Sequence, residues 1–125
     1  MSHYFVDHAE FARLLAERYP HLDASIDAIE RGLLHLEMAV LARETTRHIE
    51  SGDLVRARDH FEFVSKVFGR ADAAVKNAVC VSYLENVFLG QAQSNRLEAR
   101  HRLPIDLEIA LVELEEYFES LRSSE

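Results

Sequence analysis

The segment 73–90, AAVKNAVCVSYLENVFLG, constrains the fold more than any other part of the chain, because it has the length of a helix but no polar side. On a helix with about 100° per residue, its apolar side chains are distributed around the whole circumference. They are Val75, Val79, Cys80, Val81, Tyr83, Leu84, Val87, Phe88 and Leu89. A helix of this kind is covered by neighbours on several sides. We therefore expect a helical bundle with a central apolar helix near residues 73–89, in which Asn77, Glu85 and Asn86 are partly buried.

The composition favours one all-α domain over residues 1–125. A chain of 125 residues is long enough for a single core, and 4 glycines with 2 prolines are too few for a turn-rich β fold. The one cysteine, Cys80, lies among apolar neighbours, as a packed thiol in a reducing compartment does. No segment resembles a signal peptide or reaches the roughly 20 apolar residues of a membrane span. We expect a cytoplasmic protein that does not enter membranes.

The charge distribution is uneven along the chain. The formal net charge is −8, which opposes general binding to nucleic-acid phosphates. Residues 105–125 contain seven acidic residues and a single basic one, Arg122. The acidity therefore belongs mainly to the C-terminal segment.

Capping residues and apolar spacing divide the chain into about five helices. The expected helix starts are Asp7, Asp23 or Ser25, Asp53, Asp72 and Pro104. The expected ends are marked by Pro20, Gly52, Gly69 and Gly90. We expect a break near Gly32 in the second helix, and a polar, locally basic connection over residues 91–103 that contains at most a short helical turn.

The common catalytic and cofactor-binding motifs are absent, and we expect neither a catalytic residue nor a cofactor. One alternative is a metal site inside the bundle. Glu37, Glu44 and His48 share one strip of the second helix, and Glu62 or Glu85 could join them from facing helices. Bundle metal sites use several Glu and His ligands, whereas the chain has a single ExxH unit, in the connection at Glu98–His101. A solvated or salt-bridged strip is therefore favoured over a metal site.

The last helix has two different faces. Its inner face, expected to dock onto the core, contains Leu107, Ala110, Leu111, Leu114, Tyr117, Phe118 and Leu121. Its outer face has an aliphatic centre with acidic residues around it, a composition typical of a contact surface. We expect a partner to bind here, at Ile105, Glu108, Ile109, Val112, Glu115, Glu116 and Glu119. Cover by another helix of the same chain and contact with a second copy are the alternatives.

Three stretches carry a resemblance to known proteins: LLHLEMAVLARETTRHIESGD (33–53), HFEFVSKVFGRADAAVKNAVCVSYLENV (60–87) and LPIDLEIALVELEEYF (103–118). With His35, Glu37, Asn77, Glu85 and Asn86 as polar landmarks, the chain resembles small all-helical bacterial proteins of uncharacterised type. Some of those are immunity proteins encoded beside polymorphic toxins. The resemblance implies a binding protein without chemistry of its own, and it transfers no functional residue.

These observations predict a non-enzymatic protein-interaction module. The most specific hypothesis is an immunity-type protein that binds and neutralises a toxin with a basic surface, because opposite charge speeds encounter and an apolar centre slows release. The alternatives are a metal-binding bundle that uses Glu37, Glu44 and His48, and a structural or regulatory homodimer.

Overall fold

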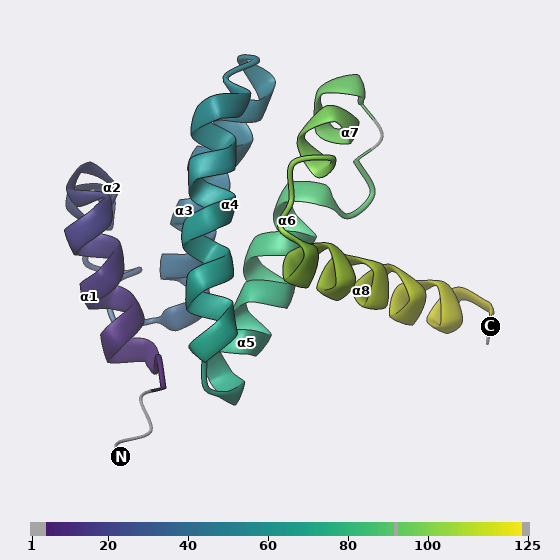
Figure 1. Cartoon of the computed structure of the whole chain (residues 1–125). Helices are drawn as coiled ribbons and strands as arrows, with labels where there is room; N and C mark the ends of the chain where they lie inside the picture. Colours follow the sequence, from purple (N-terminus) through teal and green to yellow (C-terminus); the bar gives the residue numbers. More distant parts are fainter. Residues whose placement is uncertain (1–4, 92, 124–125) are drawn as a thin grey trace.

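The computed structural model of the chain describes residues 5–91 and 93–123, and it is all-α over that range (Figure 1). The elements are α1 (His8–Arg18), α2 (Pro20–Ser25), α3 (Leu34–Glu50), α4 (Leu54–Arg70), α5 (Ala73–Ala78), η1 (Val79–Leu84), α6 (Glu85–Phe88), α7 (Ser94–Arg100) and α8 (Ile105–Ser123). α5, the π-helical η1 and α6 follow one another without interruption as one continuous helix, residues 73–88. Counted in this way, the described residues form seven helices. The all-α class is confirmed, and the expected number of about five helices is not exact.

Three aspartates begin helices as predicted. The carboxylates of Asp7, Asp53 and Asp72 each accept a hydrogen bond from the backbone N–H three residues later, at 2.9, 3.1 and 2.9 Å. These bonds satisfy backbone donors that have no partner within the first turn. Gly52 and Gly90 have φ of +81° and +75°, a backbone conformation that only glycine adopts without strain.

The predicted second helix is divided into α2 and α3 by a turn over residues 26–33. The carboxylate of Asp27 accepts from the N–H of Ile29 at 3.0 Å and of Glu30 at 2.8 Å. Such local bonds compete with helical ones, and Gly32 with φ +87° completes the turn. Asp23 and Ser25 lie within α2 and do not cap a long helix, so that prediction is wrong.

The polar connection expected over residues 91–103 contains the helix α7, which is longer than a single turn. Two buried residues, Arg96 and Ala99, attach α7 to the rest of the protein. Nε of Arg96 donates to the carbonyl of Val87 at 2.9 Å. A buried arginine that binds a backbone carbonyl cannot be recognised in a sequence that is polar on average. Tertiary contacts, and not the local composition, therefore stabilise residues 94–100 as a helix.

The core lies between α3 and the continuous helix 73–88. α3 packs against α4, α5, η1, α6 and α7, and the continuous helix also contacts α1 and α8. Leu41 of α3 and Tyr83 of η1 are fully buried. The helix near residues 73–89 is therefore central, as its apolar sequence predicts.

One side of the central helix nevertheless stays exposed. Asn77 and Asn86 are exposed, Val81 retains 41% of its accessible surface, and Glu85 is half-buried. The π-helical turn of η1 lets three consecutive side chains, at positions 82–84, point into the core. The expected partial burial is therefore confirmed for Glu85 and wrong for Asn77 and Asn86, although the helix has neighbours on several sides.

The structure predicts a large difference between two leucines of α3. Leu41→Ala removes a fully buried side chain and is expected to lower the free energy of unfolding by about 2–5 kcal/mol. Leu36→Ala, at a position with 39% exposure on the same helix, is the matched control and is expected to cost much less. Urea denaturation of both variants measures the difference, and equal losses would contradict this description of the core.

Candidate functional site

The first two turns of α8 fix its position on the protein. The N–H groups of Leu107 and Glu108 donate to the carbonyl of Pro104 at 3.1 and 3.0 Å, and Ser65 of α4 donates to the carboxylate of Asp106 at 2.8 Å. Leu107, Ala110 and Leu111 are buried. This half of the predicted inner face docks onto the core as expected.

Beyond Leu111 the burial of α8 decreases, and we call residues 112–123 the arm of α8. Figure 1 shows the arm extending away from the other helices toward the C-terminus. Leu114 and Phe118 are half-buried, whereas Tyr117 and Leu121 are 58% and 46% exposed. The expected docking of the inner face therefore extends to Leu114, which packs against the core, and is wrong for the exposed Tyr117.

The aliphatic centre of the outer face is open to solvent. Ile105 and Ile109 are 73% and 52% exposed, and Val112 is partly buried. No helix in the described part of the chain covers these two isoleucines. Of the alternatives for this surface, cover by another of the described helices is therefore excluded, and a partner or a second copy remains.

Arg100 of α7 holds two of the acidic residues. Its guanidinium donates to both carboxylate oxygens of Glu115 at 2.7 Å, and it lies 3.5 Å from Glu108. These hydrogen bonds lower the pKa of Glu115 and raise the pKa of Arg100. A bidentate pair of this kind fixes orientation as well as charge. Glu108 and Glu115 therefore orient α8 in the free chain, a role that the sequence did not reveal.

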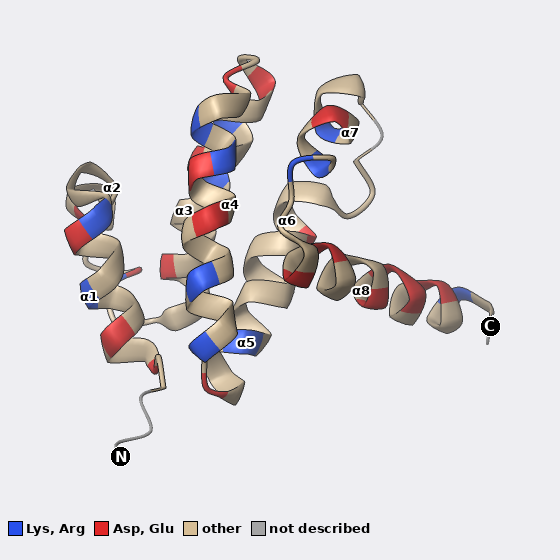
Figure 2. Cartoon of the chain, in the orientation of Figure 1, with Lys and Arg blue, Asp and Glu red and all other residues tan. Residues whose placement is uncertain are grey.

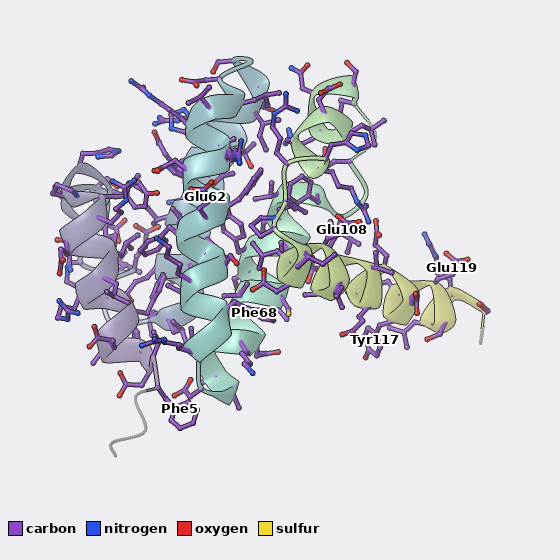
Figure 3. All side chains as sticks on the ribbon, viewed as in Figure 1. Phe5, Glu62, Phe68, Glu108, Tyr117 and Glu119 are labelled. Carbon is purple, nitrogen blue, oxygen red and sulfur yellow. The ribbon has the colours of Figure 1, made fainter. Side chains whose placement is uncertain are left out.

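The other acidic residues of the outer face are less constrained. Glu119 pairs with Arg122 at 2.5 Å, and Glu116 is exposed and makes no ion pair with another described residue. Figure 2 shows the positions of acidic residues distributed along the ribbon of α8, and Figure 3 shows Glu108 and Glu119 on the side opposite Tyr117. The helix thus presents an acidic side and an apolar underside.

The proposed metal ligands do not come together. Glu37 is buried at the start of α3, where it contacts Nε2 of His8 at 2.6 Å and accepts from the N–H of Gly32 at 2.9 Å. Glu44 lies two helical turns away, roughly 10 Å along the axis, and contacts His48 at 3.4 Å.

The facing residues do not complete such a site. Glu62 is exposed and pairs with Arg58, and Glu85 is half-buried on α6. Within residues 5–91 and 93–123, no group of three or more His, Cys, Asp or Glu could hold a metal ion.

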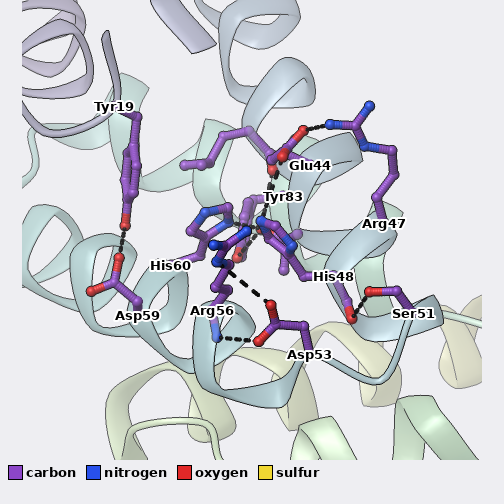
Figure 4. Close-up of polar contacts among 12 residues, drawn as sticks. Tyr19, Glu44, Arg47, His48, Ser51, Asp53, Arg56, Asp59, His60 and Tyr83 are labelled. Carbon is purple, nitrogen blue, oxygen red and sulfur yellow. Dashed lines mark hydrogen bonds and ion pairs between the residues drawn. The ribbon is translucent and has the colours of Figure 1, made fainter. Parts of the chain in front are cut away.

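A buried polar cluster lies beside Glu44 and His48, and the sequence did not indicate it (Figure 4). Oγ1 of Thr45 lies 2.8 Å from the hydroxyl of Tyr83, 2.9 Å from Nδ1 of His60 and 3.0 Å from the carbonyl of Leu41. A hydroxyl donates once and accepts twice, and a carbonyl only accepts. Thr45 therefore donates to Leu41, while Tyr83 and His60 donate to Thr45. His60 carries its proton on Nδ1.

The environment of His60 keeps it neutral. Burial, with a smaller contribution from the neighbouring His48 ring at 5.1 Å, lowers the pKa of His60 from 6.5 to about 4. General acid–base catalysis is most effective when a group has a pKa near the operating pH. The Thr45 cluster therefore resembles a structural connection between α3, α4 and η1 more than a catalytic site.

A family model described as Domain of unknown function (DUF7674) matches residues 12–119. No curated protein and no solved structure matches the chain. None of the described helices combines the length and apolar character needed to cross a membrane.

The buried His60 predicts a loss of stability in mild acid. Between pH 6.5 and about 4 the unfolded chain takes up a proton at this position and the folded protein does not, so the free energy of unfolding falls as the pH falls. The expected loss is roughly 3 kcal/mol over this window. Urea denaturation at several pH values measures it.

His60→Asn is the control for this prediction, because its amide nitrogen can donate to Thr45 in place of Nδ1 but does not titrate. The difference in stability between the wild type and this variant should narrow as the pH falls. A difference that is independent of pH would show that His60 has no depressed pKa.

Proposed function

The chain belongs to this family of domains of unknown function, and we propose that it is a non-enzymatic, cytoplasmic protein-interaction domain that binds a partner through the outer face of α8. The exposure of Ile105 and Ile109 carries this proposal. Both lie on a rigid helix that Arg100 orients in the free chain. A preorganised apolar centre of this kind needs little reordering when a partner binds, which favours affinity.

The charges around this centre favour a basic partner. Glu116 has no cationic partner among the described residues, and Glu119 is exposed beside Arg122 at the end of the helix. Arginine or lysine side chains on the partner would complement these carboxylates at the rim. Burial of the isoleucines would then slow dissociation, while the charges would accelerate encounter.

The most specific form of this proposal is an immunity-type protein that neutralises a toxin. It is supported by the resemblance over most of residues 33–121 and by the acidic character of α8. Occlusion of a basic, substrate-binding surface would inhibit a toxin without any chemistry on this chain. The metal-binding alternative has less support, since Glu37 is held apart from Glu44 and His48.

Ile109→Asp is expected to abolish partner binding, because it places a carboxylate in the desolvated centre of an already acidic surface. The free energy of unfolding should change by less than about 1 kcal/mol, since Ile109 is exposed in the free chain. Affinity purification of the tagged chain from its native host, followed by mass spectrometry, measures binding.

Val55→Asp is the matched control, an equally large change of charge at an 82% exposed valine on α4. It should retain the partner that Ile109→Asp loses. If both variants recover the same proteins as the wild type, the outer face of α8 is not the binding surface. For the immunity hypothesis, the recovered protein must be toxic when it is expressed alone and harmless when this chain is co-expressed.

A further inference from the structure

The outer face of α8 has a stripe of side chains with the spacing of a coiled-coil seam. Ile105, Ile109 and Val112 are separated by four and three residues, and Glu116 follows after another four. Ile105 and Ile109 are 73% and 52% exposed, Val112 is partly buried and Glu116 is exposed. At 1.5 Å per residue these four residues cover about 16 Å, or three helical turns. We call them the outer stripe.

Acidic residues flank the outer stripe on both sides. Helical spacing places Asp106 and Glu113 along one flank and Glu108 and Glu115 along the other. Glu108 and Glu115 share the single guanidinium of Arg100, so this flank keeps an excess of negative charge. The outer stripe therefore lies between two acidic flanks.

Two carboxylates of this surface have no cation beside them. Glu113 and Glu116 are exposed, and neither makes an ion pair with another residue of the described chain. Burial and, to a smaller extent, the charge of Glu113 raise the pKa of the Cys80 thiol in η1. A molecule that covers the outer stripe withdraws these carboxylates from water, which costs free energy unless it brings cations of its own. The surface therefore favours a basic partner on grounds that do not involve the residues already paired within the chain.

The shape of the outer stripe fits a helix better than a strand. A strand binds by adding to the edge of a sheet, and the described part of the chain contains only an isolated bridge between Val6 and Ala71. The outer stripe instead presents protruding isoleucines on a helix that Arg100 orients. Side chains with this spacing pack between those of a second helix as knobs into holes.

We propose that the outer stripe pairs with an amphipathic helix of the partner, whose apolar residues have the same spacing and whose flanking residues are lysine or arginine. This pairing rests on the proposed function and specifies the kind of partner that the surface fits. Ile105 and Ile109 supply the desolvated centre, and Glu113 and Glu116 bind the cations. A second copy of this chain does not fit, because parallel or antiparallel pairing of two outer stripes brings acidic flanks together.

Fluorescence anisotropy of three labelled peptides, each of about three heptads, tests this pairing on the full chain. The first peptide has leucine in its seam and lysine on both flanks, and the second has glutamate in place of the lysines. The third has the composition of the first, with its leucines distributed around the helix. The first peptide is expected to bind and to become helical by circular dichroism. The other two should bind at least about tenfold more weakly.

Substitutions on α8 should weaken binding of the first peptide while the helical circular dichroism of the chain is unchanged. Ile109→Asp should raise the dissociation constant at least about tenfold, because a carboxylate enters the apolar seam. Glu116→Lys should raise it about fivefold or more, because like charges then face each other. Glu17→Lys is the matched control for charge, since it lies on α1, at the opposite edge of the molecule from α8 (Figure 1). Glu17→Lys and Val55→Asp should bind the peptide as the wild type does.

Other outcomes overturn the pairing. If the first peptide does not bind at the highest soluble concentration of the chain, the outer stripe does not pair with a basic helix. Equal affinity for the third peptide shows charge attraction without helix packing, and equal affinity for the second excludes a basic partner helix. An unchanged affinity in Ile109→Asp places peptide binding elsewhere on the protein.

Capture of the native partner separates this pairing from the proposed function. If Ile109→Asp loses the native partner and the wild type binds none of the peptides, the proposed function stands and the pairing with a basic helix is wrong. If Ile109→Asp loses the first peptide but captures the same native proteins as the wild type, the proposed function is wrong, because the outer face binds a helix that the native partner does not supply.

Discussion

The hydroxyl of Thr45 is the point at which the three central helices of this protein meet. It donates to the carbonyl of Leu41 in α3 and accepts from His60 of α4 and Tyr83 of η1. Every hydrogen-bonding position of that oxygen is used, and a donor without a partner in such a buried site costs free energy. Loss of any one group leaves another unsatisfied, so the cluster specifies how α3, α4 and η1 pack as well as stabilising their packing.

The placement of α8 follows from this core. Leu107 and Leu111 dock against the central helices, and Arg100 on α7 binds Glu115 at 2.7 Å, just beyond the last buried turn. α7 itself is held by Arg96, which donates to the carbonyl of Val87 at the end of the central helix. A chain of contacts thus connects the core to the arm. It holds in a defined direction a helix whose outer face exposes Ile105 and Ile109.

Much of the fold can be predicted from local signals. Asp7, Asp53 and Asp72 mark helix starts because a short carboxylate satisfies free backbone donors in any context. The central position of the helix near residues 73–89 follows from its lack of a polar side. The position of Ile109 opposite the core stripe could be predicted, but its exposure could not, because cover by another helix of the chain was an equally open alternative. Arg96 and Arg100 could not be assigned, since a charged residue in a polar segment resembles solvated surface until its partner is known.

The sequence by itself determined the all-α class, the three aspartate-capped helix starts, the central apolar helix and the division of α8 into an apolar and an acidic side. Each depends on spacing or on bonds within a few residues. Only the tertiary structure decided that full burial of the inner face of α8 ends at Leu111, that Glu115 is bound by Arg100, and that Glu37 lies apart from Glu44. Helical periodicity states which residues share a face, but the length of the helices beside that face determines how much of it is covered.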